Sequence, residues 1–163
     1  MKKLVFLLVL VVAGFATANA QVNPHAIGVR FGGGTYYGAE VSYQHGLGES
    51  HRMELDLGWN GGLYHTRVFF SGIYHWHWNI VEGLNWYIGP GAFVGMYLDE
   101  VKLGVGVGGQ VGIEYDFNTL DVPILVSLDS RPMFHFLPWY DRDDIHYMSP
   151  FDPSVALSVR YTF

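Results

Sequence analysis

The stretch that decides the fold is LGVGVGGQVGIEYDF, residues 103–117. Apart from Gly109, its odd-numbered positions are apolar from Leu103 to Phe117. Its even-numbered positions hold glycine, Gln110, Glu114 and Asp116. Because neighbouring side chains of a strand point to opposite faces, this alternation predicts a β-strand between two different environments.

Seven further segments alternate in the same way and are punctuated by Gly, Asn and Asp. In segment 65–78, Phe69 and Ile73 interrupt the alternation by placing apolar side chains on the polar face. Pro90 and Pro123 are expected near bulges or strand ends, because proline has no backbone N–H to donate to the neighbouring strand. Eight antiparallel strands predict a closed barrel, which leaves no exposed edge strand. The other segments are 27–31, 37–44, 52–59, 65–78, 85–96, 122–131 and 151–163.

The two faces predict which side of the barrel meets lipid. Glycines such as Gly104 and Gly106 would form a poor solvent surface, but they suit a narrow barrel interior. Aromatic residues fall at strand ends, where membrane barrels place interfacial girdles, and Tyr37 and Trp59 fall at the opposite rim. The girdle expected on the periplasmic side comprises Trp76, Trp78, Trp86, Tyr115, Tyr161 and Phe163.

The N-terminal sequence predicts an exported protein. Lys2 and Lys3 precede an apolar run, and Ala18-Asn19-Ala20 matches a signal-peptidase site, so residues 1–20 are expected to be a cleaved signal peptide and 21–163 a single barrel domain. The chain contains no cysteine, which excludes disulfides and thiolate metal sites. Its formal net charge of −6 argues against a nucleic-acid partner.

The last residues, ALSVRYTF (156–163), alternate and end in Phe163. This segment resembles the final strand of bacterial outer-membrane β-barrels, and the whole chain resembles the small OmpA/OmpX-type barrels without an added periplasmic domain. The resemblance implies an all-β, eight-stranded, antiparallel up-and-down transmembrane barrel in the bacterial outer membrane. It also implies contact with outer-membrane lipid and lipopolysaccharide, and recognition by the barrel-assembly machinery through the C-terminal strand.

The polar face predicts a charged barrel interior. Buried charges persist when they are paired, and an eight-stranded interior is filled by side chains, so we expect a plug of ion pairs in place of an open pore. The charges expected to point inward are Arg30, Glu40, Glu54, Asp56, Arg67, Glu114, Asp129, Arg131 and Arg160.

Two histidines suggest a metal site as an alternative use of the interior. His75 and His77 share one strand face, which is a spacing that Zn²⁺ can accept, and His65 is a candidate third ligand. No HExxH string or calcium loop supplies further ligands, so no cofactor is expected.

The acidic segment 138–150 is expected to be a surface loop that contacts an extracellular ligand. Its candidate contact residues are Trp139, Tyr140, Asp143, Asp144, His146 and Tyr147. We therefore expect a structural or surface-interaction role. The alternative is a small outer-membrane enzyme, lipid-modifying or protease-like, that uses His and Asp groups of the loop or lumen. Asp144-Ile145-His146 resembles the Asp-x-His element of omptin proteases, which also need a second Asp pair.

Overall fold

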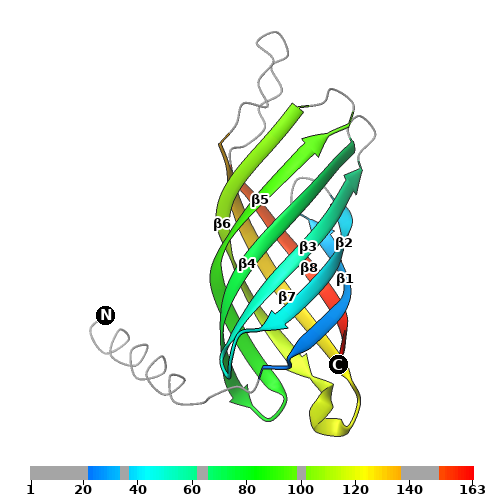
Figure 1. The fold of residues 1–163 in the computed structure, drawn as a ribbon, viewed down its shortest axis with the longest axis vertical. Coiled ribbons are helices and arrows are strands. Elements are labelled where there is room, and N and C mark those ends of the chain that lie inside the picture. Colours follow the sequence, from blue (N-terminus) through cyan, green and yellow to red (C-terminus); the bar gives the residue numbers. More distant parts are fainter. Residues whose placement is uncertain (1–21, 34–36, 62–65, 99–101, 137–150) are drawn as a thin grey trace, which may run out of the picture.

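The computed structural model describes residues 22–33, 37–61, 66–98, 102–136 and 151–163, and it is a closed antiparallel barrel (Figure 1). The predicted signal peptide and the 138–150 loop lie outside the described residues. Each strand pairs with its neighbours in sequence, and β1 pairs with β8 to close the barrel. The elements are β1 (His25–Gly33), β2 (Tyr37–Gly46), β3 (His51–Gly61), β4 (Thr66–Val81), β5 (Leu84–Tyr97), β6 (Lys102–Asp116), the 3₁₀ helix η1 (Phe117–Leu120), β7 (Ile124–His135) and β8 (Phe151–Thr162).

The strands are tilted, and the start of β1 and the end of β8 lie at the same end of the barrel (Figure 1). This termini end also carries the tight β4–β5 turn and η1, which joins β6 to β7. Asp116 caps η1, because its carboxylate accepts from the backbone N–H of Asn118 at 2.8 Å. We call the other end of the barrel the loop end.

The distribution of side chains is inverted relative to that of a water-soluble protein. Among the described residues, 20 buried side chains are polar or charged and only eight are apolar. Large apolar side chains cover the outside instead: Phe31 is 55% exposed, Leu57 56% and Leu157 51%. A continuous apolar exterior of this kind needs a hydrocarbon environment. No helix in the described part of the chain is long and apolar enough to cross a membrane.

Inward-facing glycines let adjacent strands approach closely. A Cβ on Gly89 would lie 1.6 Å from the carbonyl oxygen of Tyr74 on β4, and one on Gly108 would lie 2.1 Å from that of Pro132 on β7. A Cβ on Gly28 would meet the Val159 carbonyl oxygen at the β1–β8 closure. Glycine is therefore required at these contacts because any side chain would force the strands apart.

The prolines are placed differently from the sequence prediction in one case. Pro123 directly precedes β7, at a strand end as predicted, but Pro90 lies inside β5 opposite Gly109 of β6. The prediction for Pro90 was therefore wrong. The pairing of β5 with β4 is interrupted beside it, which accommodates the missing donor, and the β4–β5 bulge lies elsewhere, between Asn79 and Val81.

Candidate functional site in the barrel interior

The interior holds equal numbers of opposite charges. Five arginines and five carboxylates are buried among the described residues, so the formal charges of the lumen cancel. Nine of the ten are the residues named from the strand pattern. The tenth is Arg52, which the alternation placed beside Glu54 and Asp56 but which was not among the predicted site residues. The buried set is Arg30, Arg52, Arg67, Arg131, Arg160, Glu40, Glu54, Asp56, Glu114 and Asp129.

Arg131 is the hub of the network. Its guanidinium donates to Glu40 at 2.8 Å, to Glu54 at 2.9 Å and to Asp56 at 2.7 Å. It also donates to Gln110 at 3.0 Å and to the Ser71 hydroxyl at 3.0 Å. One β7 side chain thus links β2, β3, β4 and β6, because the planar guanidinium offers five donors in a fixed geometry.

Two more arginines extend this layer to the rest of the wall. Arg30 on β1 pairs with Glu40 of β2 and, at 2.6 Å, with Asp129 of β7. Arg160 on β8 donates to Glu54 at 3.0 Å and to the hydroxyls of Ser42 and Ser127, each at 2.9 Å. Ion pairs therefore cross the barrel in several directions and fix the strands relative to one another.

A second layer lies nearer the termini end and contains the predicted histidines. Arg52 contacts both carboxylate oxygens of Glu114, at 2.8 and 2.9 Å, and its guanidinium carbon lies 4.5 Å from the ring centroid of Tyr87. Glu114 also contacts His77 at 3.2 Å, while His75 Nδ1 accepts from Arg52 Nε at 3.3 Å. The two histidines are thus engaged with different partners in this layer.

This arrangement bears on the metal hypothesis. Within the described ranges, no group of three or more His, Asp or Glu side chains is placed to hold a metal ion. The structure therefore supplies no third ligand to His75 and His77 from that part of the chain. His65, the predicted third ligand, lies outside the described residues.

The interior also contains an apolar cluster. Ile73, Phe93 and Met133 form this buried cluster from β4, β5 and β7. Ile73 is opposite Glu54 in the β3–β4 register, so the cluster lies beside the ion network. The sequence prediction of a charged interior missed the cluster, although Phe69 and Ile73 had interrupted the polar face of the fourth segment.

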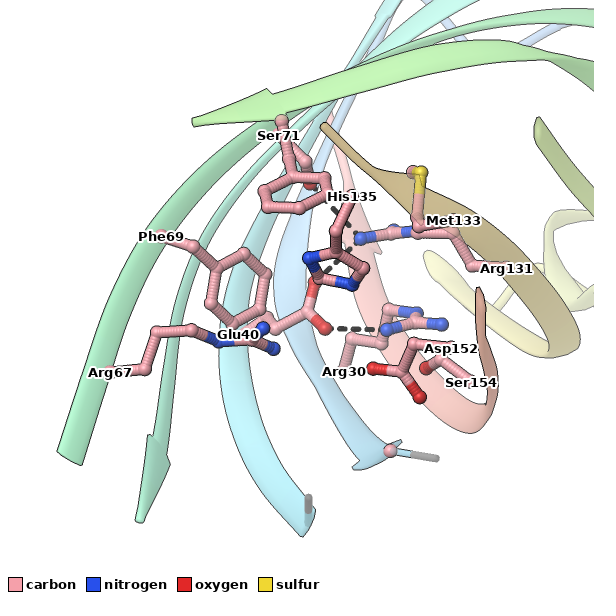
Figure 2. Close-up of a pocket in the computed structure, with 12 residues that line it drawn as sticks. Arg30, Glu40, Arg67, Phe69, Ser71, Arg131, Met133, His135, Asp152 and Ser154 are labelled. Carbon is pink, nitrogen blue, oxygen red and sulfur yellow. Dashed lines mark hydrogen bonds and ion pairs between the residues drawn. The ribbon is translucent and has the colours of Figure 1, made fainter. Parts of the chain in front are cut away.

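A small cavity of about 40 Å³ lies at the loop end, bordered by residues of the apolar cluster and of the ion network (Figure 2). Figure 2 shows Glu40 between Arg30 and Arg131, with Phe69 and His135 nearby. The volume suits a few water molecules rather than an organic ligand. The lining residues are Arg30, Gly33, Glu40, Arg67, Phe69, Ser71, Phe93, Arg131, Met133, His135, Asp152 and Ser154.

A wider hollow of about 450 Å³ opens at the termini end. Its walls are rich in amides: Asn23 donates to Asp116 at 2.9 Å, and Asn79 donates to Asn85 at 2.9 Å. Asn118 also lines it and donates to Asp116. The hollow is a polar vestibule, and Glu114 of β6 lies buried further in on one of the strands that line it.

The predicted girdle residues lie at strand ends on the termini side. Trp78 and Trp86 stack with their ring centroids 4.6 Å apart across β4 and β5. Trp76 is 41% exposed, Tyr161 55% and Phe163 62%. Tyr115 packs edge-on against Phe117 at 4.8 Å. The predicted loop contacts Trp139, Tyr140, Asp143, Asp144, His146 and Tyr147 lie outside the described residues.

The closed eight-strand order, the apolar exterior and the polar interior define a small transmembrane β-barrel of the outer-membrane type. Among solved structures, the chain is similar to Neisserial surface protein A (NspA), with a TM-score of 0.59 and 11% sequence identity over 85% of this chain and 96% of that one. At this identity the likeness is one of fold. It confirms the predicted fold class and the resemblance to small outer-membrane barrels. No protein-family model and no curated protein matches the sequence.

Proposed function

We propose that this chain is an integral outer-membrane protein whose barrel is a sealed, rigid scaffold that presents surface loops. The observation that carries the proposal is the interior, in which the formal charges of five arginines and five carboxylates cancel and an apolar cluster lies beside them. Pairing on this scale fills the lumen and links strands far apart in the sequence, so it favours a structural or surface-interaction role over conduction. The predicted signal peptide over residues 1–20 supports export.

The orientation in the membrane follows from the two ends. The turns at the termini end are short and described throughout, as is usual for periplasmic turns of outer-membrane barrels, and the longest connection, 137–150, joins β7 to β8 at the other end. We therefore assign the termini end to the periplasm and segment 138–150 to the cell surface, where its aromatic and acidic residues form the proposed contact region.

A conductance measurement tests the sealed lumen. The purified protein, refolded into a planar lipid bilayer, is expected to give no stable current steps, whereas an open porin in the same bilayer gives them. Regular steps from the wild-type barrel would refute the scaffold proposal. Lipopolysaccharide incubated with the same preparation is expected to keep its mass, and a change in its acyl chains would favour the enzyme alternative.

Protease access tests the orientation. Five of the six arginines are buried in the lumen, so Arg142 is the arginine that trypsin can reach in segment 138–150. Trypsin added to intact cells is expected to cut after Arg142, and an Arg142→Gln variant is expected to resist cleavage there. Cleavage at Arg142 only after the outer membrane has been permeabilised would place this loop on the periplasmic side and overturn the assignment.

A further inference from the structure

Two histidines face each other on the outer surface of the barrel at the termini end. His25 is the first residue of β1 and His45 the next-to-last residue of β2, and the register places them directly opposite each other. Both belong to the outward set of their strands, on which Ile27 and Val41 are 46% and 54% exposed. Directly opposite side chains are the pairs that come into contact across an antiparallel ladder.

A third polar group lies beside this pair, in contact with His25. The Nδ1 atoms of His25 and His45 are 3.3 Å apart, and the Tyr43 hydroxyl lies 2.9 Å from His25 Nδ1. A ring nitrogen has one position for a proton or a lone pair, so His25 Nδ1 cannot form two well-aligned hydrogen bonds at once. A cation that accepts one lone pair from each group would satisfy all three atoms.

The spacing fits a tetrahedral metal ion. Two imidazole nitrogens bound at about 2.0–2.1 Å to a tetrahedral Zn²⁺ are roughly 3.3–3.4 Å apart, which matches the observed separation of 3.3 Å. Imidazole is a common ligand of Zn²⁺ and of other first-row transition metals such as Cu²⁺ and Ni²⁺. The site differs from the metal site predicted at His75 and His77, because its histidines come from two strands and face outward.

The neighbouring rings hold the pair in position. The His25 ring stacks on Phe163 with centroids 5.4 Å apart, and it lies 5.0 Å from the His45 ring at an interplanar angle of 28°. The backbone N–H of Phe163 donates to the carbonyl of His25 at 3.0 Å, which ties the end of β8 to the same point. Packing of this kind lowers the entropic cost of holding the ligands together.

We propose that His25 and His45, with Tyr43 as a third ligand, form a site for a Zn²⁺-class divalent ion at the periplasmic rim of the barrel. Water or a lipid phosphate oxygen completes the tetrahedron. Because β1 pairs with β8 on its other side, the bound ion would link β2 to the strand that closes the barrel. The proposal does not depend on whether the lumen is sealed.

The test uses untagged, folded full-length protein in detergent and Co²⁺ as the spectroscopic probe. Wild type is expected to bind one equivalent of Co²⁺ with the intense visible absorption of tetrahedral cobalt, and Zn²⁺ is expected to displace it because Zn²⁺ binds such sites more tightly. His25→Phe and His45→Phe keep a ring for packing but remove the nitrogen. Each is expected to weaken binding by roughly 10²–10⁴-fold, as when one of two linked contacts is lost.

His51→Phe is the matched control, since His51 lies on the same rim but stacks on Tyr74 of β4, with centroids 5.8 Å apart. This variant is expected to keep the cobalt absorption, and Tyr43→Phe is expected to reduce it. Gel mobility before and after boiling shows that each variant is folded. No tetrahedral absorption in wild type, full absorption in either His→Phe variant of the pair, or its loss in His51→Phe would each overturn the proposal.

Discussion

Replacing Arg131 with Met is the sharpest test of the ion network. The change removes ion pairs to Glu40, Glu54 and Asp56 from a buried site. Glu40 keeps its pair with Arg30, and Glu54 keeps its pair with Arg160. Within the described residues, Asp56 has its ion pair with Arg131 alone, and its remaining contact is the Ser71 hydroxyl at 3.4 Å. Most of the lost stability is therefore expected to come from the Asp56 carboxylate, which is left buried without an ion-pair partner.

Leaving a buried charge without its partner costs roughly 3–5 kcal/mol. At a urea dependence of roughly 2 kcal/mol per molar, the unfolding midpoint of Arg131→Met should fall by about 2 M. The assay is urea unfolding of the barrel in phospholipid vesicles, followed by the fluorescence of its five tryptophans and by gel mobility. Adding Asp56→Asn should recover most of the loss, because the unpaired charge is then gone.

Arg160→Met is the matched comparison. It also removes a buried guanidinium, but Glu54 keeps its pair with Arg131, so this variant should lose less stability than Arg131→Met. Two results would refute the reasoning. One is an unchanged urea midpoint in Arg131→Met, and the other is a purely additive effect of Asp56→Asn in the double variant.

Three further predictions concern strand contact, charge geometry and assembly. Gly89→Ala should prevent folding, because its Cβ would lie 1.6 Å from the Tyr74 carbonyl oxygen. Gly72→Ala is the control and should fold as wild type, because its Cβ meets only Leu55, at 3.6 Å. Gel mobility after refolding distinguishes the two variants. Arg52→Lys should lower the free energy of unfolding by about 2 kcal/mol in the urea assay, because an ammonium that contacts Glu114 keeps neither the Nε donation to His75 nor the planar contact with Tyr87. An unchanged midpoint would contradict this. Deleting Phe163 should lower the amount of assembled barrel in cells while leaving refolding in detergent intact, and equal loss in both settings would argue against a role in recognition by the assembly machinery.

The alternation of apolar and polar residues predicted which side chains face the lumen, because the direction of a side chain is a local property of its strand. Whether Arg30 or Leu57 points inward depends on its position in the strand, and period-two patterning reports that position. The same argument placed Arg52 on the inner face, but its importance emerges only from contacts with Glu114 on β6 and Tyr87 on β5. Those partners are brought together by the register of four strands, which no single segment encodes.

The network around Arg131 shows the same limit. Arg131 and Glu54 are 77 residues apart, and they meet because the barrel closes with a particular stagger. Pro90 shows a different limit of sequence prediction. The pairing with one neighbouring strand can be interrupted to accommodate the missing N–H donor, so a proline in a barrel strand does not have to mark the end of that strand. Pairs such as His25 and His45 are likewise a product of register, since they lie on different strands.

Because the formal charges in the lumen cancel, the net negative charge of the protein comes from residues outside that buried set. Five of the 15 acidic and five of the nine basic residues lie in the lumen, and two lysines belong to the predicted signal peptide. Among the described residues, the charges outside this buried set lie at strand ends or in turns: Glu49, Glu82, Asp116, Asp121, Asp152 and Lys102. Four of these acids, Glu49, Glu82, Asp116 and Asp121, lie at the termini end, so the described part of the barrel is a neutral cylinder with one anionic rim. The field of this rim is screened by ionic strength and divalent ions, while the ion pairs inside are insulated from the surrounding salt.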